Sequence, residues 1–567
     1  MTELLTAAQM RAIETAAIES GAVTGLALME RAGAGAVAAV FEEWPDLAED
    51  TQSAVVLCGP GNNGGDGFVV ARLLAEAGWT VEVFLYGDAE KLPPDARTNY
   101  LRWCELGAVT ALTPDAVGQG TRPALMVDAM FGTGLSRAIP LDCALAFRAV
   151  EARDVGDRHP WRVPYHVVAL DCVSGLDCDS GKVLLPPHPG ETDNEDADVE
   201  AHMQWWGQEG APRLLHPHLT VTFHRRKVGH YLGNPLSRLR VVDIGLGEED
   251  RHPAHLQLPR SQEVACLLDF DRPRGARRRI WPGRDLDKAM GRNAHKFDHG
   301  HALVLSGGPG RTGAARLAAR GALRIGAGLV TLGVPPSAQM EVAAQITSLM
   351  LRRVADDDAL EAVLEDDRIT ALCLGPGLGL HDHAEALVDR VLGGGHLRLT
   401  RRVVFDADAL TLMARNAQRL DALNDNAVLT PHGGEFARLF PDIAERLAAV
   451  PDQGPAYSKV DATREAAARC GAVVLFKGPD TVIAHPDGRV SVHAALYARA
   501  APWLATAGAG DVLAGFIAGL LARGFAPMEA AEMAAWLHVE CARAFGPGLI
   551  AEDLPDILPQ VLREVGI

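Results

Sequence analysis

The sequence predicts an α/β protein that consists of two different three-layer αβα domains with mainly parallel sheets. Its 567 residues exceed what one hydrophobic core usually holds, which indicates at least two domains. In both halves, apolar strand patterns lead into glycine-rich loops and then into amphipathic helices. Residues 249–285 are rich in Arg, Asp and Pro, which is typical of a linker. We therefore expect domains at 1–248 and 286–567, joined by a linker at 249–285.

The first half repeats a strand followed by a polar or glycine-rich loop. An amphipathic helix that ends at a glycine is expected at FVVARLLAEAG (68–78). Ligands of parallel sheets bind beyond the carboxyl ends of the strands, so the loops should meet at one edge. The expected strands and their loops are SAVVLCG (53–59), TVEVFLYG (80–87), ALMVDAMFGTGL (124–135) and YHVVALDCVSGLDCDSG (165–181).

Two later stretches complete the expected first domain. LTVTFHRRKVGHYLG (219–233) and RLRVVDIGLG (238–247) restore strand character and close the domain near residue 248. Within the first stretch, His-Arg-Arg-Lys at 224–227 is expected to be an exposed run of charges. Residues 186–212 are acidic and contain Pro and a Trp pair, which predicts an exposed excursion whose role the sequence does not assign.

The second half has the same alternation but a different order of motifs, which predicts a second α/β domain rather than a duplication. A strand enters a glycine-rich loop and a long helix of small residues at its start. The segments with these patterns are 299–335, ITALCLGPGLG (369–379), RRVVFDADAL (401–410), NAVLTPHGGEF (426–436), GAVVLFKGPDTVIAHPDG (471–488) and LATAGAGDVLAGFIAGLLARG (504–524).

Composition excludes several classes of function. A net charge of −19 argues against a nucleic-acid surface. The chain has no apolar run of the length that crosses a membrane, about 18 residues or more. Its start lacks the pattern of a signal peptide. The nine cysteines are scattered without a C-x-x-C pair, which favours free thiols in a reducing compartment. We expect a cytoplasmic protein with no nucleic-acid or membrane partner.

The sharpest chemical signal is TAGAGD at 506–511, directly before an apolar helix. Gly508 and Gly510 allow backbone N–H groups to converge at the helix start, which forms an anion site. A carboxylate at Asp511 would repel a phosphate, so it is better explained as a base that removes a proton from an attacking hydroxyl. The alternative is that Asp511 only caps the helix. Lys477 and Thr481 surround a nearby turn suited to phosphates, although an ordinary hairpin has the same pattern.

The stretch GPGNNGGDGF (59–68) matches the dinucleotide pattern G-x-G-x-x-G. A dehydrogenase also needs an acidic residue about 20 positions further on, at the end of the next strand. The chain offers only Glu82, inside the expected strand, or Asp88, past its end. The two asparagines and Asp66 also have no evident use beside a cofactor pyrophosphate. A nicotinamide dehydrogenase is therefore disfavoured.

Six motifs of the second half together resemble the carbohydrate-kinase-like NAD(P)H-hydrate dehydratases, which have the ribokinase-like fold. The resemblance implies dehydration of hydrated NADH or NADPH (NADHX, NADPHX), with ADP as co-substrate and Mg²⁺ beside the nucleotide. It implies that Ala314, Gly377, His432 and Asp511 face the hydrate, and that Lys477, Gly478, Pro479, Asp480, Thr481, Gly508 and Gly510 hold the nucleotide. The six motifs are TGAARLAARGALRIGAGLVTLGVP, GPGLG, DADAL, LTPHGGEF, KGPDT and LATAGAGDVLAG.

Two positions depart from that family's usual motifs. Gly433 stands where the family has a proline, and we expect it to loosen the loop that presents His432. Ala509 replaces a threonine, which removes one hydroxyl near the nucleotide but leaves the backbone donors. Neither change deletes a group that is expected to do chemistry.

The first half resembles NAD(P)H-hydrate epimerase, with a Rossmann-like domain. The residues that carry the resemblance are LCGPGNNGGDGFVVARLL, VDAMFGTGLSR, VVALDCVSGLDCDSG and the early LTAAQMRAIE…VTGLALMERAG. The resemblance implies potassium binding by Asn63, Asp128 and Ser174. It implies hydrate binding by Asn62, Asn63, Gly64, Gly65, Asp66, Gly132, Thr133, Gly134, Leu135, Ser136, Arg137, Ala138 and Asp171.

Asp171 is the candidate acid/base that interconverts the two C6 epimers. Without the resemblance, a hydrogen-bonded aspartate at a strand end would explain it as well. Val173 replaces the family's usual proline, which we expect to soften the turn before Ser174. Cys172 and Cys178 are interpreted as incidental thiols rather than metal ligands.

The leading hypothesis is a bifunctional repair enzyme that epimerises NAD(P)HX and then dehydrates the S form. The alternative enzyme is a small-alcohol kinase of the ribokinase superfamily, because the GAGD chemistry would serve both. A third possibility is that the first half only senses dinucleotides and regulates the second. We also expect a homo-oligomer.

Overall fold

The computed structural model describes residues 2–153, 165–184, 186, 215–233, 237–246, 264–268, 286, 288, 295–393 and 401–567. Most of the expected linker and, apart from residue 186, the acidic excursion therefore lie outside the described residues. The chain forms two compact units. The N-terminal unit is Glu3–Leu258 with Ala449–Ser458, and the C-terminal unit is Met1–Thr2, Pro259–Ala448 and Lys459–Ile567.

The N-terminal unit has a seven-stranded sheet in the order β4-β3-β2-β5-β6-β7-β8. Every neighbouring pair of its strands is parallel, as the sequence predicts. All connections therefore cross over the sheet, and the carboxyl ends of the strands share one edge. The strands are β2 (Ser53–Cys58), β3 (Thr80–Leu85), β4 (Val109–Ala111), β5 (Leu125–Ala129), β6 (His166–Leu170), β7 (Leu219–Phe223) and β8 (Arg238–Val242).

Helices cover both faces of this sheet, which confirms a three-layer α/β domain. Val55 and Leu57 of β2 join a core with the helices α6 and α7. On the other face, α2, α4 and α5 pack together. The helices are α1 (Ala7–Glu19), α2 (Gly25–Glu43), α3 (Asp46–Glu49), α4 (Asn62–Glu76), η1 (Ala89–Lys91), α5 (Pro94–Cys104), α6 (Pro114–Val117), α7 (Leu141–Glu151) and η2 (Val228–Tyr231).

Helix α4 begins earlier than the sequence predicts. It was expected from residue 68 but starts at Asn62, inside the glycine-rich stretch. Glycines make this possible because the first turn lies against the strands. A Cβ on Gly64 would lie 2.0 Å from the Gly59 carbonyl oxygen, and one on Gly67 would lie 2.6 Å from the Ala129 Cβ. The helix N-terminus, with its free N–H groups, is therefore brought to the carboxyl edge of the sheet.

The chain begins with the short strand β1 (Thr2–Leu4). The sheet of the C-terminal unit has the order β9-β18-β17-β16-β15-β14-β13-β10-β11-β12. It is parallel from β16 to β12, whereas β17 is antiparallel to both of its neighbours. The other strands are β9 (Ala265–Leu267), β10 (His301–Leu305), β11 (Leu329–Val334), β12 (Met350–Arg353), β13 (Ile369–Leu374), β14 (Arg402–Phe405), β15 (Ala427–Leu429), β16 (Val473–Phe476), β17 (Asp480–Ala484) and β18 (Val490–Ala494).

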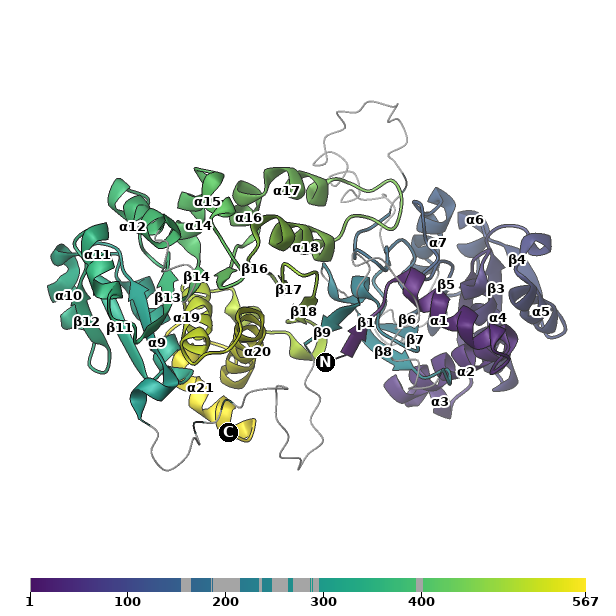
Figure 1. The fold of residues 1–567 in the computed structure, drawn as a ribbon. Helices are drawn as coiled ribbons and strands as arrows, with labels where there is room; N and C mark the ends of the chain where they lie inside the picture. The colour runs from purple at the N-terminus through teal and green to yellow at the C-terminus, as the bar shows by residue number, and fades with distance from the viewer. Residues whose placement is uncertain are drawn as a thin grey trace. The chain divides into compact units, whose positions relative to one another are not determined.

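Two groups of helices flank that sheet (Figure 1). One group contains η5 (Lys296–His299), α9 (Gly313–Arg324), α19 (Ala509–Ala522), α20 (Pro527–Phe545) and α21 (Asp553–Glu564). The other contains α11 (Asp357–Leu364), α12 (Asp382–Gly393), α14 (Ala407–Ala414), α15 (Gln418–Asp421), α16 (Gly433–Leu439), α17 (Pro441–Ala448) and α18 (Lys459–Cys470). Shorter helical segments are η6 (Pro336–Ala338), α10 (Gln339–Ala343), η7 (Tyr497–Arg499) and η8 (Pro502–Leu504).

Small residues bring α19 and α9 into close contact against the sheet (Figure 1). A Cβ on Gly515 would lie 2.1 Å from the Ala318 carbonyl oxygen, and one on Gly519 would lie 2.6 Å from that of Ala322. Nearly every residue of α19 after its first turn is buried. This packing fixes the start of α19, which carries the TAGAGD motif. In the described part of the chain, no helix is both long and apolar enough to span a membrane.

Candidate active sites

A pocket of about 520 Å³ lies at the carboxyl edge of the N-terminal sheet. The loops after β2, β5, β6 and β7 and the helix α1 line it. Gly64 and Gly65 do not line it, because both are buried in the first turn of α4. The other expected hydrate-binding residues all do: Asn62, Asn63, Asp66, Gly132, Thr133, Gly134, Leu135, Ser136, Arg137, Ala138 and Asp171.

Asp171 is held at the floor of this pocket by an ion pair that the sequence interpretation missed. Its Oδ1 accepts a hydrogen bond from Lys227 Nζ at 2.8 Å, and its Oδ2 accepts one from the Thr133 N–H at 2.9 Å. Burial alone would raise the pKa of Asp171, but the Lys227 ammonium and these hydrogen bonds lower it to about 2. Asp171 is therefore an ionised carboxylate at neutral pH.

The expectation that residues 224–227 form an exposed charge run is wrong, because two of the four are buried and the other two are only partly exposed. Lys227 is 1% exposed and His224 is 3% exposed. All three Nζ protons of Lys227 have acceptors, since the group also donates to Thr222 Oγ1 and to the Phe223 carbonyl. The position of Lys227 in the loop after β7 was the available signal, because that loop ends at the same sheet edge as the others.

Two further carboxyls face the same pocket, with their pKa values shifted in the opposite direction. Desolvation, followed by the charges of Asp171 and Glu14, raises the pKa of Asp66 well above its ordinary value. Desolvation and the charge of Asp171 also raise the pKa of Glu14. Carboxyls whose pKa values are pushed apart in one pocket can serve as an acid and a base.

The three residues expected to bind potassium lie beside this pocket. Asp128 is fully buried and accepts hydrogen bonds from Ser174 Oγ at 2.6 Å and from the Ser174 N–H at 2.8 Å. Burial raises the pKa of Asp128 to about 6, although these hydrogen bonds oppose it. Asn63 has both side-chain polar atoms buried without a hydrogen-bond partner. A Cβ on Gly132 would lie 3.2 Å from Asn63 Oδ1 and 2.9 Å from Asp171 Oδ2, so these side chains converge there.

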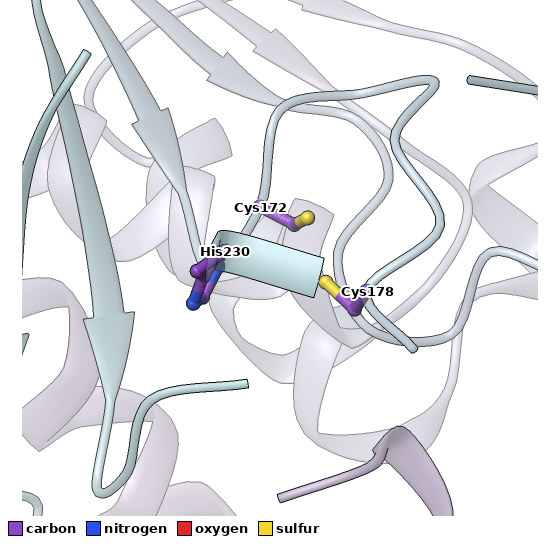
Figure 2. Close-up of side chains that lie close together, drawn as sticks. All are labelled: Cys172, Cys178 and His230. Carbon is purple, nitrogen blue, oxygen red and sulfur yellow. The ribbon is translucent and has the colours of Figure 1, made fainter. Parts of the chain in front are cut away.

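The sulfurs of Cys172 and Cys178 and the imidazole of His230 lie close together (Figure 2). His230 Nδ1 accepts the Lys227 backbone N–H at 3.2 Å, so its Nε2–H donates to the Asp171 carbonyl at 3.0 Å. Burial lowers the pKa of His230 to about 4, which keeps the ring neutral. Because both ring nitrogens are engaged, the imidazole has no lone pair left for a metal. It fixes the backbones of Asp171 and Lys227 instead.

In the C-terminal unit, a second cluster lies at the carboxyl ends of five adjacent parallel strands, β10, β13, β14, β15 and β16. Gly377 follows β13 in the left-handed conformation, with a φ of 65°. A Cβ on Gly377 would lie 3.4 Å from the Ala314 Cβ, which brings these two expected hydrate-binding positions together. The start of α19 closes the same edge of the sheet.

Asp511 does not cap α19. The N-cap residue is Gly508, with a φ of 88°, and Asp511 is the third residue of the helix. Burial and then the charge of Asp406 raise the pKa of Asp511 to about 6, although Lys477 opposes this. A carboxyl with a pKa this close to neutrality has the property that favours general-base catalysis.

Lys477 carries the positive charge of this cluster. Its Nζ donates to Asp406 Oδ1 at 2.7 Å and lies 3.7 Å from Glu435 Oε2. A Cβ on Gly510 would lie 3.6 Å from the same Nζ, so the ammonium faces the start of α19. Burial would lower the pKa of Lys477, but Asp406 and Glu435 outweigh it and raise that pKa. Asp406 is the first residue of the DADAL motif, but the sequence does not predict its pairing with Lys477.

The turn after β16 is held by contacts of its own side chains. The Gly478 N–H donates to Thr481 Oγ1 at 3.2 Å, and that hydroxyl donates to the Gly478 carbonyl at 2.8 Å. Asp480 pairs with Lys459, with 2.7 Å between Oδ1 and Nζ. The side chains of Asp480 and Thr481 thus hold the turn, and its backbone and Lys477 remain for a ligand.

His432 has a firmer position than the sequence predicts. It is the N-cap of α16, where its Nδ1 accepts the Gly434 N–H at 3.0 Å and its own N–H donates to Glu435 Oε2 at 2.8 Å. Gly433 is the first residue of that helix, and nothing would meet a Cβ there within 4 Å. The cap hydrogen bonds lie on both sides of Gly433, and the expectation that this glycine loosens the loop stays a prediction.

The fold and the two sites define a two-domain α/β enzyme in which each unit has its own polar centre at the carboxyl ends of parallel strands. Residues 302–560 match the family model described as NAD(P)H-hydrate dehydratase, and residues 25–229 match the one described as YjeF-related protein N-terminus. A bifunctional NAD(P)H-hydrate repair enzyme from Moorella thermoacetica is 32% identical over 99% of this chain and 97% of its own length. The bifunctional NAD(P)H-hydrate repair enzyme of Salinibacter ruber is 33% identical over 99% of this chain and 96% of its own length.

The chain belongs to the family of bifunctional NAD(P)H-hydrate repair enzymes, which confirms the resemblances of both halves. The first half alone is similar to the NAD(P)H-hydrate epimerase of Rhodobacter capsulatus, which is 41% identical over 43% of this chain and 97% of that protein. Among solved structures, an ADP/ATP-dependent NAD(P)H-hydrate dehydratase from Bacillus subtilis, co-crystallised with ATP/Mg²⁺, is 28% identical with a TM-score of 0.39. It covers 49% of this chain and 93% of that one.

Proposed function

We propose that the N-terminal unit interconverts the R and S forms of NADHX and NADPHX, and that the C-terminal unit dehydrates the S form at the expense of ADP. The observation that carries this proposal is the pairing of family membership along nearly the whole chain with one complete polar centre in each unit. The products of the second reaction are NADH or NADPH, AMP and phosphate.

In the N-terminal unit, the start of α4 is proposed to face the diphosphate of the dinucleotide, because its free N–H groups and the helix dipole favour an anion. The ionised Asp171 takes the proton of the C6 hydroxyl. The bond between C6 and the ring nitrogen opens, a C6 aldehyde forms, and the ring nitrogen takes a proton from Asp66. Reclosure on the other face reverses both proton transfers and yields the other epimer.

The structure supports this division of roles through charge. Lys227 keeps Asp171 ionised, whereas desolvation and neighbouring carboxylates favour a protonated Asp66. Asp171 can therefore accept a proton while Asp66 donates one, without either group having to change its resting state first.

A potassium ion is proposed beside Asn63, Asp128 and Ser174. The unpartnered Asn63 oxygen and the buried Asp128 carboxylate supply the oxygens and the single formal charge that a monovalent cation favours. Bound there, the ion would offset the cost of burying the Asp128 charge. It would also hold the loop at Gly132 against Asn63.

In the C-terminal unit, Gly508, Gly510 and Lys477 are proposed to hold the nucleotide phosphates, with Mg²⁺ bound to the nucleotide. Asp511 takes the proton of the C6 hydroxyl as that oxygen attacks the terminal phosphorus of ADP, and AMP leaves. The phosphate then leaves C6 with the bonding electron pair. Loss of a proton from C5 to solvent restores the carbon–carbon double bond of NAD(P)H.

Mixing R- and S-NADPHX with the protein, with and without ADP, tests both activities in one assay. NADPH absorbance should recover only with ADP, because dehydration consumes ADP. Recovery should be complete, because the R form is converted to the S form by epimerisation. Without ADP, chromatography should show the R:S ratio of a pure epimer moving to equilibrium faster than in buffer. A phosphorylated hydrate that accumulates without NADPH would favour the small-alcohol kinase instead. Binding of NADPHX by the N-terminal unit without epimerisation would favour the dinucleotide sensor.

A further inference from the structure

A short segment from the second half of the chain belongs to the N-terminal unit. Residues 449–458 follow α17 and precede α18, yet they cluster with Glu3–Leu258. We call this segment the strap. The Gly454 N–H donates to the Ser136 carbonyl at 3.1 Å, and Gln453 forms an antiparallel bridge with Arg137.

The strap contacts a second loop of the same unit. The Ala456 N–H donates to Asp177 Oδ2 at 2.8 Å, and both residues are buried. Asp177 is itself fixed, because its Oδ2 accepts the Ser180 hydroxyl at 2.5 Å. A Cβ on Gly454 would lie 3.2 Å from the Leu135 carbonyl oxygen and 3.4 Å from Asp177 Oδ1, so the backbone fits closely between the two loops.

Both loops belong to the proposed epimerase site. Leu135, Ser136 and Arg137 line the 520 Å³ pocket, and Asp177 lies in the same loop as Asp171. Ser136 and Arg137 themselves are exposed and lie in no helix or strand. Ordering such residues costs backbone entropy. The strap supplies the backbone partners that hold this part of the pocket wall in one conformation.

We propose that the strap is a positioning segment for the epimerase site, which makes substrate binding by the first half depend on residues 449–458 of the second half. The proposal rests on the proposed function of the N-terminal unit. Arg137 is a lining residue whose backbone pairs with the strap, and its guanidinium offers a positive charge to a phosphate of the dinucleotide. The strap touches no reacting atom, so its effect falls on substrate binding rather than on the chemical step.

The test uses full-length variants. Gly454→Val places a branched side chain against Leu135 and Asp177, and Ala456→Pro removes the N–H that Asp177 accepts. The matched control is Gly393→Val, at an exposed helix end of the same half of the chain with nothing within 4 Å of a Cβ. The measurements are kcat and KM for R-to-S epimerisation of NADPHX, and ADP-dependent dehydration of S-NADPHX in the same samples.

Each strap variant is expected to raise the epimerase KM about ten- to hundredfold, the size of one or two lost hydrogen bonds, with little change in kcat. Amide hydrogen exchange over residues 132–138 should become faster. Dehydration of S-NADPHX and both activities of the control should stay unchanged. Unchanged dehydration shows that the C-terminal unit is folded, and the retained epimerase kcat shows the same of the N-terminal unit. An unchanged epimerase KM and unchanged exchange in both strap variants would overturn the proposal. Absence of epimerisation in the wild-type chain would instead overturn the proposed function.

Discussion

Replacing Asp511 with asparagine separates catalysis from structure in the C-terminal unit. The two side chains have nearly the same shape, so Gly508, Gly510 and the start of α19 should keep their positions. The pKa of Asp511 is about 6. At pH 7 about nine-tenths of the wild-type molecules therefore have the base form. The amide of the variant cannot accept a proton at any pH.

The expected loss follows from the role of a general base, which contributes about 10²- to 10⁴-fold in rate. ADP-dependent NADPH recovery from S-NADPHX should fall by that factor. ADP affinity, measured by calorimetry, should stay the same or rise, because a negative charge beside the phosphates is removed. In the wild-type protein, recovery should decline as the pH falls below about 6, since Asp511 then becomes protonated.

The thermal stability of the Asp511→Asn variant distinguishes a general base from a helix cap. Folding raises the pKa of Asp511, so the ionised form is less favourable in the folded protein than in the unfolded chain. The variant should therefore unfold at the same temperature as the wild type or a higher one. A helix cap would behave in the opposite way and cost about 0.5–2 kcal/mol. Recovery within about threefold of wild type, far below a general-base effect, would refute the mechanism. The R:S equilibration rate serves as the internal control.

Four other substitutions test the remaining assignments. Asp171→Asn should slow epimerisation by about 10²-fold or more, with ADP-dependent dehydration of S-NADPHX as the unaffected control. Lys227→Met removes the ammonium that pairs with Asp171, so the pKa of Asp171 should rise and the free energy of unfolding in urea should fall by about 3–5 kcal/mol. The double variant Lys227→Met/Asp171→Asn should recover much of this unfolding free energy. Asp128→Ala should abolish any difference in epimerase rate between potassium and potassium-free buffer, and a persisting difference would place the cation elsewhere. Lys477→Met should weaken ADP binding by about tenfold or more in calorimetry, the size of a lost charge-assisted hydrogen bond, without changing the R:S rate.

Strand ends were the part of the site most readily predicted. Asp128 and Asp171 stand at or directly after apolar strand patterns, and parallel pairing brings such positions to one edge of the sheet. TAGAGD was informative for a similar reason, because glycines before an apolar helix indicate a free helix N-terminus. The family resemblance added the substrate, which no spacing of residues could supply.

Lys227 shows where such reasoning fails. A run of His, Arg, Arg and Lys usually indicates a solvated surface, and here the backbone turns so that only its middle is partly exposed. His224 adopts a φ of 60°, and the chain after it leads Lys227 inward to Asp171. The burial of a lysine depends on the carboxylate that receives it, and that carboxylate is 56 positions away in the sequence.

The sequence by itself determined the fold class and the resemblance of each half to its own family, because periodicity, glycine-rich loops and family motifs are local properties of the chain. Only the tertiary structure decided which side chains share a charge environment: Lys227 with Asp171, and Lys477 with Asp406. It also decided that residues 449–458 complete the unit formed by the first half. These features are contacts between distant segments, and their energies depend on burial and distance, which packing alone sets.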